Sequence, residues 1–342
     1  MPETGTTMRA VLFHRKGDPA VLACEDVPVP AVPPGHVLVR VEAAGVNFAD
    51  VVRRAGDGYP VPTPLPYTLG TEFAGTVARL GDQVDQHAVG DRVFGLVDPV
   101  TSGCYAEYVA VPAMAAYPLP DWLDPADSTA LLVQGLTAFL ALRDGVRLAE
   151  GDSVLVLGAA GGLGSLAVQI ARELRAGLVV GAASTPEKLA LITELGADDA
   201  VNYSEPGWVE RAVAATGGRG FDTALLAGDR EVIAGALGAM APFGRIRLLG
   251  ANDPGALVVD FMAEMGAGRL SANETIGFFT LTHYASPAMW PEVGVAMRTL
   301  LEQVRGRTLS PVVRHRFPLA EAAAAHRQIE NRATTGKVVL IP

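Results

Sequence analysis

A glycine-rich turn between two apolar segments constrains the fold of this chain more than any other feature. Residues 153–157 (Ser-Val-Leu-Val-Leu) are typical of a short buried strand, and residues 158–164 follow as Gly-Ala-Ala-Gly-Gly-Leu-Gly. Apolar residues then recur across 166–171 on one face of a helix. A strand, a glycine turn and a helix in this order are typical of a dinucleotide site, where the pyrophosphate lies on the helix N-terminus.

The small residues of this turn each have a physical reason. Gly161 lets the backbone approach a pyrophosphate, and Gly164 lets the helix pack closely against the strand. The usual first glycine of the pattern is replaced by Ala159, so the turn reads Ala-x-Gly-x-x-Gly. We therefore expect the turn to bind a dinucleotide through Ala160, Gly161, Gly162 and Leu163. The alternative is an ordinary glycine-rich turn.

The residues that follow the turn favour NADPH over NADH. About 20 residues beyond the glycines, an NAD site usually carries an acid that bonds the ribose 2′-hydroxyl. Here 181–184 reads Gly-Ala-Ala-Ser, without an acid. Ser184 can donate to a 2′-phosphate, Lys188 follows one helical turn later, and Tyr203 ends the next apolar run. For Lys188 the alternative is a solvated surface position.

Composition limits the class of protein. With 342 residues, 49% of them hydrophobic, the chain is long enough for two domains with cores of their own. The net charge of −10 argues against nucleic acid or an anionic membrane as a partner. Residues 1–8 lack the apolar stretch of a signal peptide, and we expect no apolar run to reach the roughly 18 residues of a membrane helix. The two cysteines, Cys24 and Cys104, lie far apart, which fits a reducing cytoplasm.

The pattern of short and long apolar segments changes along the chain. Short runs between 9 and 111, with Gly-Asp turns at 81–82 and 90–91, favour a barrel-like β unit. From Pro125 onward, helix-length patterns alternate with five short runs that we expect to be parallel strands: 153–157, 178–182, 200–202, 221–226 and 245–249. The C-terminal part then predicts helices at 288–305 and 319–329 and strands near 312–317 and 337–341.

These patterns predict an α/β protein of two domains. Residues 1–126 and 284–342 would form the β-rich domain, and 127–283 the doubly wound parallel-sheet domain that binds the dinucleotide. The cleft between the domains would hold the active site.

A series of short motifs occurs along the chain in a characteristic order. They are GVNFAD at 45–50, GTEFAG at 70–75, GDRV at 90–93, GCYAEY at 103–108, GLTA at 135–138, the glycine turn at 158–164 and TGKVVL at 335–340. Together they resemble the zinc-independent quinone oxidoreductases of the medium-chain dehydrogenase/reductase superfamily, the group that includes ζ-crystallin. The resemblance covers nearly the whole chain. It implies a GroES-like β domain with a Rossmann domain, NADPH as cofactor, and a homodimer.

The same resemblance bears on metal binding. Zinc-dependent relatives place a cysteine where Asn47 stands and a histidine where Thr71 stands, and this chain has neither. It also lacks the lobe whose four cysteines hold a structural zinc, and its six histidines do not cluster in the sequence. Zinc needs three or four ligands at fixed geometry. We therefore expect no metal, which disfavours alcohol oxidation.

Without a metal, the hydride of NADPH needs an acceptor that delocalises the incoming charge. A quinone meets this requirement, so we expect a quinone oxidoreductase. The alternative within enzymes is an enoyl or 2-alkenal reductase acting on an α,β-unsaturated carbonyl. The alternative from another class is a non-catalytic NADPH-binding protein, with a crystallin-like or redox-sensing role.

Two residues are the candidates for direct contact with the acceptor. Asn47 lies at the junction of a predicted strand and helix, and the resemblance places it at the active-site floor. There it would hydrogen-bond a substrate carbonyl or a ribose hydroxyl, with helix capping as the alternative. Tyr59 lies in a loop similar to the one that carries the proton-donating tyrosine of enoyl reductases. Packing against the neighbouring prolines is its alternative role.

The resemblance also places further residues near the cofactor: Gln134, Thr137, Gly250, Phe278, Phe279, Arg332 and Lys337. Gln134 and Thr137 would line the nicotinamide side, with polarity of a helix surface as the alternative. Phe278 and Phe279 would lie beside the nicotinamide or in a dimer interface. Arg332 and Lys337 would reach the adenosine half or close the cleft, with solvated surface charge as the alternative.

Overall fold

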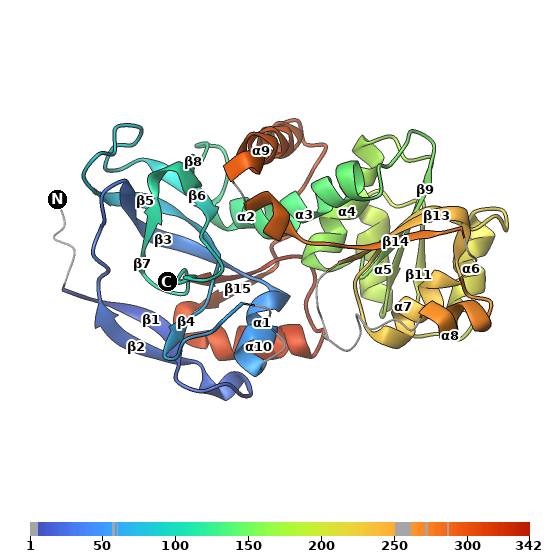
Figure 1. Cartoon of the computed structure of the whole chain (residues 1–342), viewed down its shortest axis with the longest axis horizontal. Helices are drawn as coiled ribbons and strands as arrows, with labels where there is room; N and C mark the ends of the chain where they lie inside the picture. The colour runs from blue at the N-terminus through green and yellow to red at the C-terminus, as the bar shows by residue number, and fades with distance from the viewer. Residues whose placement is uncertain (1–5, 57–58, 60, 250–260, 271–272, 286) are drawn as a thin grey trace. The chain divides into compact units, whose positions relative to one another are not determined.

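The computed structural model describes residues 6–56, 59, 61–249, 261–270, 273–285 and 287–342 (Figure 1). The chain divides into two compact units. The first unit is Met1–Val133 with Val312–Pro342, and the second unit is Gln134–Pro311. Both ends of the chain therefore belong to the first unit.

The first unit is mainly β. Its strands are β1 (Thr7–Phe13), β2 (Ala23–Pro28), β3 (His36–Val46), β4 (Tyr67–Thr68), β5 (Glu72–Leu80), β6 (Arg92–Leu96), β7 (Tyr108–Pro112), β8 (Ala116–Pro118), β15 (His315–Pro318) and β16 (Val338–Ile341). Its helices are α1 (Phe48–Ala55), α2 (Pro125–Ala130) and α10 (Ala322–Glu330). A seven-stranded sheet is ordered β15-β16-β3-β5-β6-β8 with β7 paired to β3, and a three-stranded sheet is ordered β2-β1-β4.

Strand β3 is the central strand of the larger sheet. It pairs with β16, β5 and β7, so the N-terminal and C-terminal segments share one sheet. Val37, Val39 and Val41 are buried on the predicted face. Leu38, which points to the opposite face, is fully buried too. A central strand is covered on both faces, which weakens the alternation seen in a half-exposed strand.

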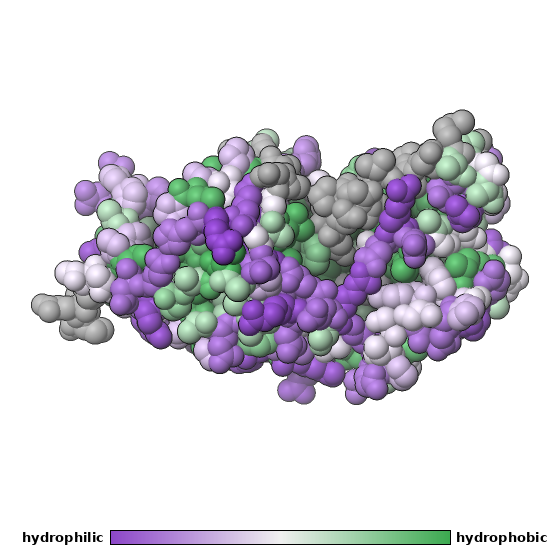
Figure 2. All heavy atoms as spheres, turned by 90° about the horizontal axis from the view of Figure 1, so that it is seen from below, coloured by the Kyte–Doolittle hydropathy of each residue, from purple (hydrophilic) through white to green (hydrophobic). Residues whose placement is uncertain are grey.

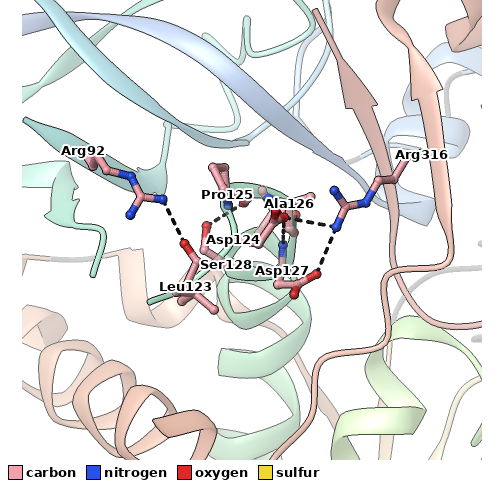
Figure 3. A network of polar contacts seen from close by, with 9 residues as sticks. Arg92, Leu123, Asp124, Pro125, Ala126, Asp127, Ser128 and Arg316 are labelled. Carbon is pink, nitrogen blue, oxygen red and sulfur yellow. Dashed lines mark hydrogen bonds and ion pairs between the residues drawn. The ribbon is translucent and has the colours of Figure 1, made fainter. Parts of the chain in front are cut away.

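The start of α2 is tied to the C-terminal segment by charged side chains (Figure 3). Asp124 caps the helix, and the Arg316 guanidinium of β15 lies 3.1 Å from its carboxylate and 3.5 Å from that of Asp127. On the other side, Arg92 donates to the carbonyl of Leu123 at 2.9 Å. These contacts join β6 and β15, which are far apart in the sequence, to the start of α2.

The second unit is a doubly wound α/β fold. Its strands are β9 (Ser153–Leu157), β10 (Leu178–Ala183), β11 (Asp199–Asn202), β12 (Phe221–Leu226), β13 (Met240–Leu249) and β14 (Thr275–Phe279). Its helices are α3 (Leu136–Leu140), α4 (Gly162–Glu173), α5 (Pro186–Glu194), α6 (Trp208–Ala215), α7 (Arg230–Leu237), α8 (Phe261–Gly266) and α9 (Trp290–Arg305). The six strands are parallel and ordered β11-β10-β9-β12-β13-β14, which confirms the predicted Rossmann fold.

Two details of the second unit differ from expectation. Phe278 and Phe279 were placed after the last strand, but they belong to a sixth strand, β14, which the sequence analysis missed. The unit begins at Gln134 and ends at Pro311, whereas the sequence placed these boundaries at 127 and 284. The second unit extends to Pro311 and not only to 283 because α9 packs against α3 of the same unit.

One helical run in the described residues is long and apolar enough to cross a membrane, contrary to the expectation from the sequence. It is Pro125–Gly145, with 21 residues and a mean hydropathy of 1.2. In this structure 78% of its apolar window is buried, as in the core helix of a folded domain.

The face shown in Figure 2 carries many hydrophilic side chains with smaller apolar areas between them.

Candidate active site

The glycine turn connects β9 to α4 as a tight, close-packed corner. Gly158 has a φ of +69°, and Gly161 caps the helix that starts at Gly162. A Cβ on Gly164 would lie 2.3 Å from the carbonyl oxygen of Gly158 and 2.7 Å from the Cα of Ala159. Only glycine fits there, which confirms the predicted reason for Gly164. The N-terminus of a 12-residue helix therefore lies directly at the end of the central strand.

Gln134 lies against this turn. A Cβ on Gly162 would lie 2.0 Å from the Oε1 of Gln134, so the glutamine side chain takes the place that a larger residue would need. Thr137, one turn further along, is buried with 8% exposure. The alternative interpretation of Thr137, as a polar residue on the surface of a helix, is therefore wrong. The structure brings Gln134 to the same edge of the sheet as the glycine turn.

Ser184 and Tyr203 lie at neighbouring strand ends. Ala183 pairs with Asn202 in the parallel register of β10 and β11, and the N–H of Tyr203 donates to the carbonyl of Ala183 at 2.9 Å. Ser184 follows Ala183 directly, and Lys188 lies in the first turn of α5, which Thr185 caps. All three candidates for the 2′-phosphate therefore lie at the carboxyl edge of the sheet, where ligands of this fold bind.

Phe278 and Phe279 lie on the edge strand β14. Together with Asp144, Thr280, His283 and Tyr284, they line a cavity of about 250 Å³. The Tyr284 hydroxyl donates to Asp144 at 2.9 Å, and burial raises the pKa of Tyr284 to about 12. Phe278 is 55% exposed. Gly250, which the sequence also placed near the cofactor, lies outside the described residues.

In the first unit, Asn47 begins α1 beside a buried ion pair. Its backbone N–H donates to the carboxylate of Asp50 at 2.9 Å, which is the local bond expected for a helix start. The Lys337 ammonium donates to the Oδ1 of Asn47 at 2.9 Å and also pairs with Glu72. Lys337 and Glu72 are both completely buried. A Cβ on Gly45 would lie 1.8 Å from the Glu72 carboxylate, which explains the glycine there.

The burial of Lys337 corrects one expectation. A solvated surface charge was the alternative for Arg332 and Lys337, and for Lys337 it is wrong. Arg332 is exposed just after α10, with a φ of +52°. Glu72 belongs to the GTEFAG motif, and the sequence alone indicated no role for it. A lysine and a glutamate 265 residues apart give no sequence signal of pairing.

A second buried polar chain was also missed. Tyr105 donates to Asp50 at 3.2 Å, and its oxygen lies 3.2 Å from the Nε2 of His326. Because the Tyr105 hydroxyl donates its own proton to Asp50, its oxygen can only accept a hydrogen bond from His326. The imidazole proton of His326 must therefore lie on Nε2. Burial raises the pKa of Asp50 to about 6 and lowers the pKa of His326 to about 3. The imidazole is therefore neutral at physiological pH.

Tyr59 lies beside the guanidinium of Arg53. The guanidinium carbon is 4.9 Å from the centre of the Tyr59 ring and 4.0 Å from that of Tyr67. Burial raises the pKa of the Tyr59 phenol, and the carboxylate of Asp50 acts in the same direction, while Arg53 opposes both. Tyr59 is therefore a half-buried phenol next to a cation, and the sequence analysis gave no role to Arg53.

The described residues hold no group of three or more His, Cys, Asp or Glu side chains that could bind a metal ion. At Asn47, where zinc-dependent relatives place a cysteine ligand, the structure places the ammonium of Lys337.

Comparisons with known proteins cover most of the chain. Residues 33–121 match the alcohol dehydrogenase GroES-like domain family, and residues 195–340 match the zinc-binding dehydrogenase family. A 2-haloacrylate reductase of Burkholderia sp is 33% identical over 97% of this chain and 98% of its own. A quinone oxidoreductase of Pseudomonas aeruginosa is 33% identical over 98% of this chain and 99% of its own. The structure of Escherichia coli quinone oxidoreductase complexed with NADPH has a TM-score of 0.88 and 29% identity, and covers 98% of this chain and 100% of that one.

Proposed function

Since this chain belongs to the zinc-independent quinone oxidoreductase group of the medium-chain dehydrogenase/reductase superfamily, we propose that it is an NADPH-dependent reductase of a quinone. The observation that carries the proposal is the carboxyl edge of the parallel sheet. There a glycine turn opens α4, and Ser184, instead of an acid, directly follows β10.

The residues at that edge fit NADPH. The N-terminus of α4 presents backbone N–H groups and the positive end of a helix dipole to a pyrophosphate. Ser184, Lys188 and Tyr203 would hold the 2′-phosphate, because no carboxylate follows β10 directly to repel it. When bound, NADPH supplies a hydride, and the protein positions the reactants and stabilises the charge that develops.

In the first unit, Lys337 orients Asn47 as a hydrogen-bond donor. An ammonium can only donate, so the atom of the Asn47 amide facing it must be oxygen. The amide nitrogen is then the group that Asn47 presents to an acceptor carbonyl or a ribose hydroxyl. A donor at the carbonyl would stabilise the negative charge left by hydride transfer.

The second candidate function is reduction of an α,β-unsaturated carbonyl. Two observations favour it: Tyr59 is held next to a cation, and one relative is named a 2-haloacrylate reductase. Hydride addition to the β-carbon leaves an enolate, whose α-carbon needs a proton. A phenol within reach can supply it.

We further propose a cytoplasmic homodimer that acts on a small molecule without nucleic acid or membrane partners. Strand β14 is the last strand in the order of the six-stranded sheet and exposes Phe278 there. An edge strand with an exposed aromatic residue can pair with a second copy of itself.

The test follows NADPH absorbance with EDTA-treated protein and two acceptors, a simple quinone and a simple enone. We expect quinone-dependent oxidation of NADPH. Enone turnover with a reduced carbon–carbon bond would move the assignment to the second candidate. If NADPH binds and neither acceptor oxidises it, a non-catalytic NADPH-binding role replaces both. Activity that requires added zinc would contradict the zinc-independent assignment.

The matched control variant is Gly161→Val. Gly161 has a φ of −76°, which any residue adopts, and a Cβ there would meet only the Gly158 carbonyl oxygen, at 3.2 Å. The protein should therefore fold normally but lose NADPH binding, because the valine side chain would occupy the path of the pyrophosphate.

A further inference from the structure

Arg53 is a buried cation that holds two loops of the first unit together. Its side chain lies in α1 and is 1% exposed. Nε donates to the hydroxyl of Thr63 at 3.0 Å, and one terminal nitrogen donates to the carbonyl of Pro62 at 2.7 Å. The other terminal nitrogen donates to the carbonyl of Pro99 and to the hydroxyl of Ser102. The guanidinium therefore joins the loop after α1 to the loop after β6.

Among the residues that the structure describes, no carboxylate forms an ion pair with Arg53. Its described hydrogen-bond partners are carbonyls and hydroxyls, and the guanidinium also lies over the rings of two tyrosines. Tyr67 also donates its hydroxyl to the carbonyl of Pro99, so this ring is held in place. The second ring is that of Tyr59, whose centre lies 4.9 Å from the guanidinium carbon of Arg53. A buried cation is costly to keep, and such groups concentrate at functional sites.

We propose that Arg53 is the positioning residue for Tyr59, and that its charge stabilises the tyrosinate formed when Tyr59 protonates the reduced acceptor. This inference rests on the second candidate function, reduction of an α,β-unsaturated carbonyl, and it assigns the role of proton donor to Tyr59. Arg53 acts through Tyr59, because its own donors bond to Thr63, Pro62, Pro99 and Ser102.

The step balances with an enone as acceptor. Hydride from NADPH forms a C–H bond at the β-carbon, and the π electrons move to the carbonyl oxygen as an enolate. The O–H bond of Tyr59 then breaks, its proton bonds to the α-carbon, and a tyrosinate remains, which water reprotonates. A quinone yields a hydroquinone anion instead, which takes its proton on oxygen from water. Loss of Arg53 should therefore slow enone reduction more than quinone reduction.

The charges facing Tyr59 have opposite effects. Asp50 and the neighbouring Tyr67 lie nearby, and Asp50 disfavours the tyrosinate, whereas Arg53 favours it. Removing the cation should therefore raise the pKa of Tyr59. Because this is a property of the side chain, it is measurable without substrate.

The test compares Arg53→Gln, which keeps N–H donors without charge, with Arg53→Lys, which keeps the charge. Arg79→Gln is the control, because it removes an exposed arginine on β5. We expect Arg53→Gln to lower kcat for the enone about tenfold, with quinone turnover within about twofold of wild type. Arg53→Lys should recover most of the loss. Tyrosinate absorbance, as the difference from Tyr59→Phe in the same background, should show a higher pKa for Tyr59 in Arg53→Gln.

Several results would overturn the proposal. One is an equal loss with both acceptors, which would mean that Arg53 only supports the fold. A second is additive losses in the Arg53→Gln/Tyr59→Phe double variant, which would show that Arg53 does not act through Tyr59. A third is an unchanged titration of Tyr59 in Arg53→Gln, the variant that removes the positive charge. Turnover of quinone alone overturns this role and leaves the proposed function standing, while turnover of neither acceptor overturns both.

Discussion

The ammonium nitrogen of Lys337 lies 2.9 Å from the side-chain oxygen of Asn47. Asn47 lies at the start of α1 and Lys337 directly precedes β16, so the N-terminal and C-terminal segments of the first unit meet at this point. The bond sets the orientation of the Asn47 amide and keeps a positive charge beside it. The same ammonium neutralises Glu72, and all three side chains are buried.

Replacing Lys337 by methionine should destabilise the protein strongly. Methionine fills much of the volume but leaves the Glu72 carboxylate buried without its partner, at a cost of about 3–5 kcal/mol. Urea unfolding measures the change in free energy. In the double variant Lys337→Met/Glu72→Gln much of the loss should return, because the glutamine can still accept the N–H of Val133, which bonds Glu72 at 2.7 Å. A double variant as unstable as Lys337→Met would show that packing, not charge, makes Lys337 necessary.

The buried His326 should make the protein less stable in acid. Its pKa is about 3 in the folded protein and near 6.5 when unfolded, so the unfolded state binds more protons between these values. The free energy of unfolding should therefore fall by about 1.4 kcal/mol per pH unit as the pH drops below about 6. His326→Gln should remove this slope in urea unfolding measured from pH 8 to pH 4.

Asp50 should have the opposite effect on the free energy of unfolding in the same pH range. Its pKa is raised to about 6 in the folded protein, so the folded state binds the extra proton. Its contribution to stability is greatest below about pH 4 and is lost as the pH rises through 6. Asp50→Asn should therefore make the acid loss of wild type steeper. Curves for Asp50→Asn and His326→Gln that run parallel to wild type would contradict both assignments.

Lys188→Ala should weaken the binding of NADPH and leave the binding of NADH unchanged. A charge-assisted bond to the 2′-phosphate contributes about 1.5–3 kcal/mol, so the KM for NADPH should rise about ten- to a hundredfold. NADH lacks that phosphate, so its KM should stay near the wild-type value. Lys16→Ala, a lysine of the first unit, is the control for loss of one positive charge. Equal increases for the two cofactors would remove Lys188 from the phosphate site.

Phe278→Asp should convert the proposed dimer to single chains. The ring is 55% exposed on the edge strand β14, and a charge there opposes pairing of two edges. Light scattering after gel filtration measures the mass, and Met114→Asp, at an exposed residue of the first unit, is the control. A wild type that is already a single chain, or a variant that stays dimeric, would show that β14 is not the interface.

Local pattern was enough to predict much of the fold. The bounds of β9 and β12 match the predicted ranges residue for residue, because each is a mainly apolar run bounded at one end by glycine. The close contact of Gly164 with the turn also follows from spacing alone. By contrast, β14 was missed, because an edge strand with a glycine and partly exposed residues lacks the continuous apolar run of a buried strand.

The sequence by itself determined the two-unit plan, the dinucleotide turn and the lack of an acid near Ser184, since each is a matter of neighbouring residues. Only the tertiary structure decided which charges meet. It placed Lys337 on Glu72 and Asn47, linked His326 through Tyr105 to Asp50, and set Arg53 against Tyr59. The physical reason is that burial and partnership of a charged side chain depend on strand register and packing across the whole unit. Neither is encoded by spacing along the chain.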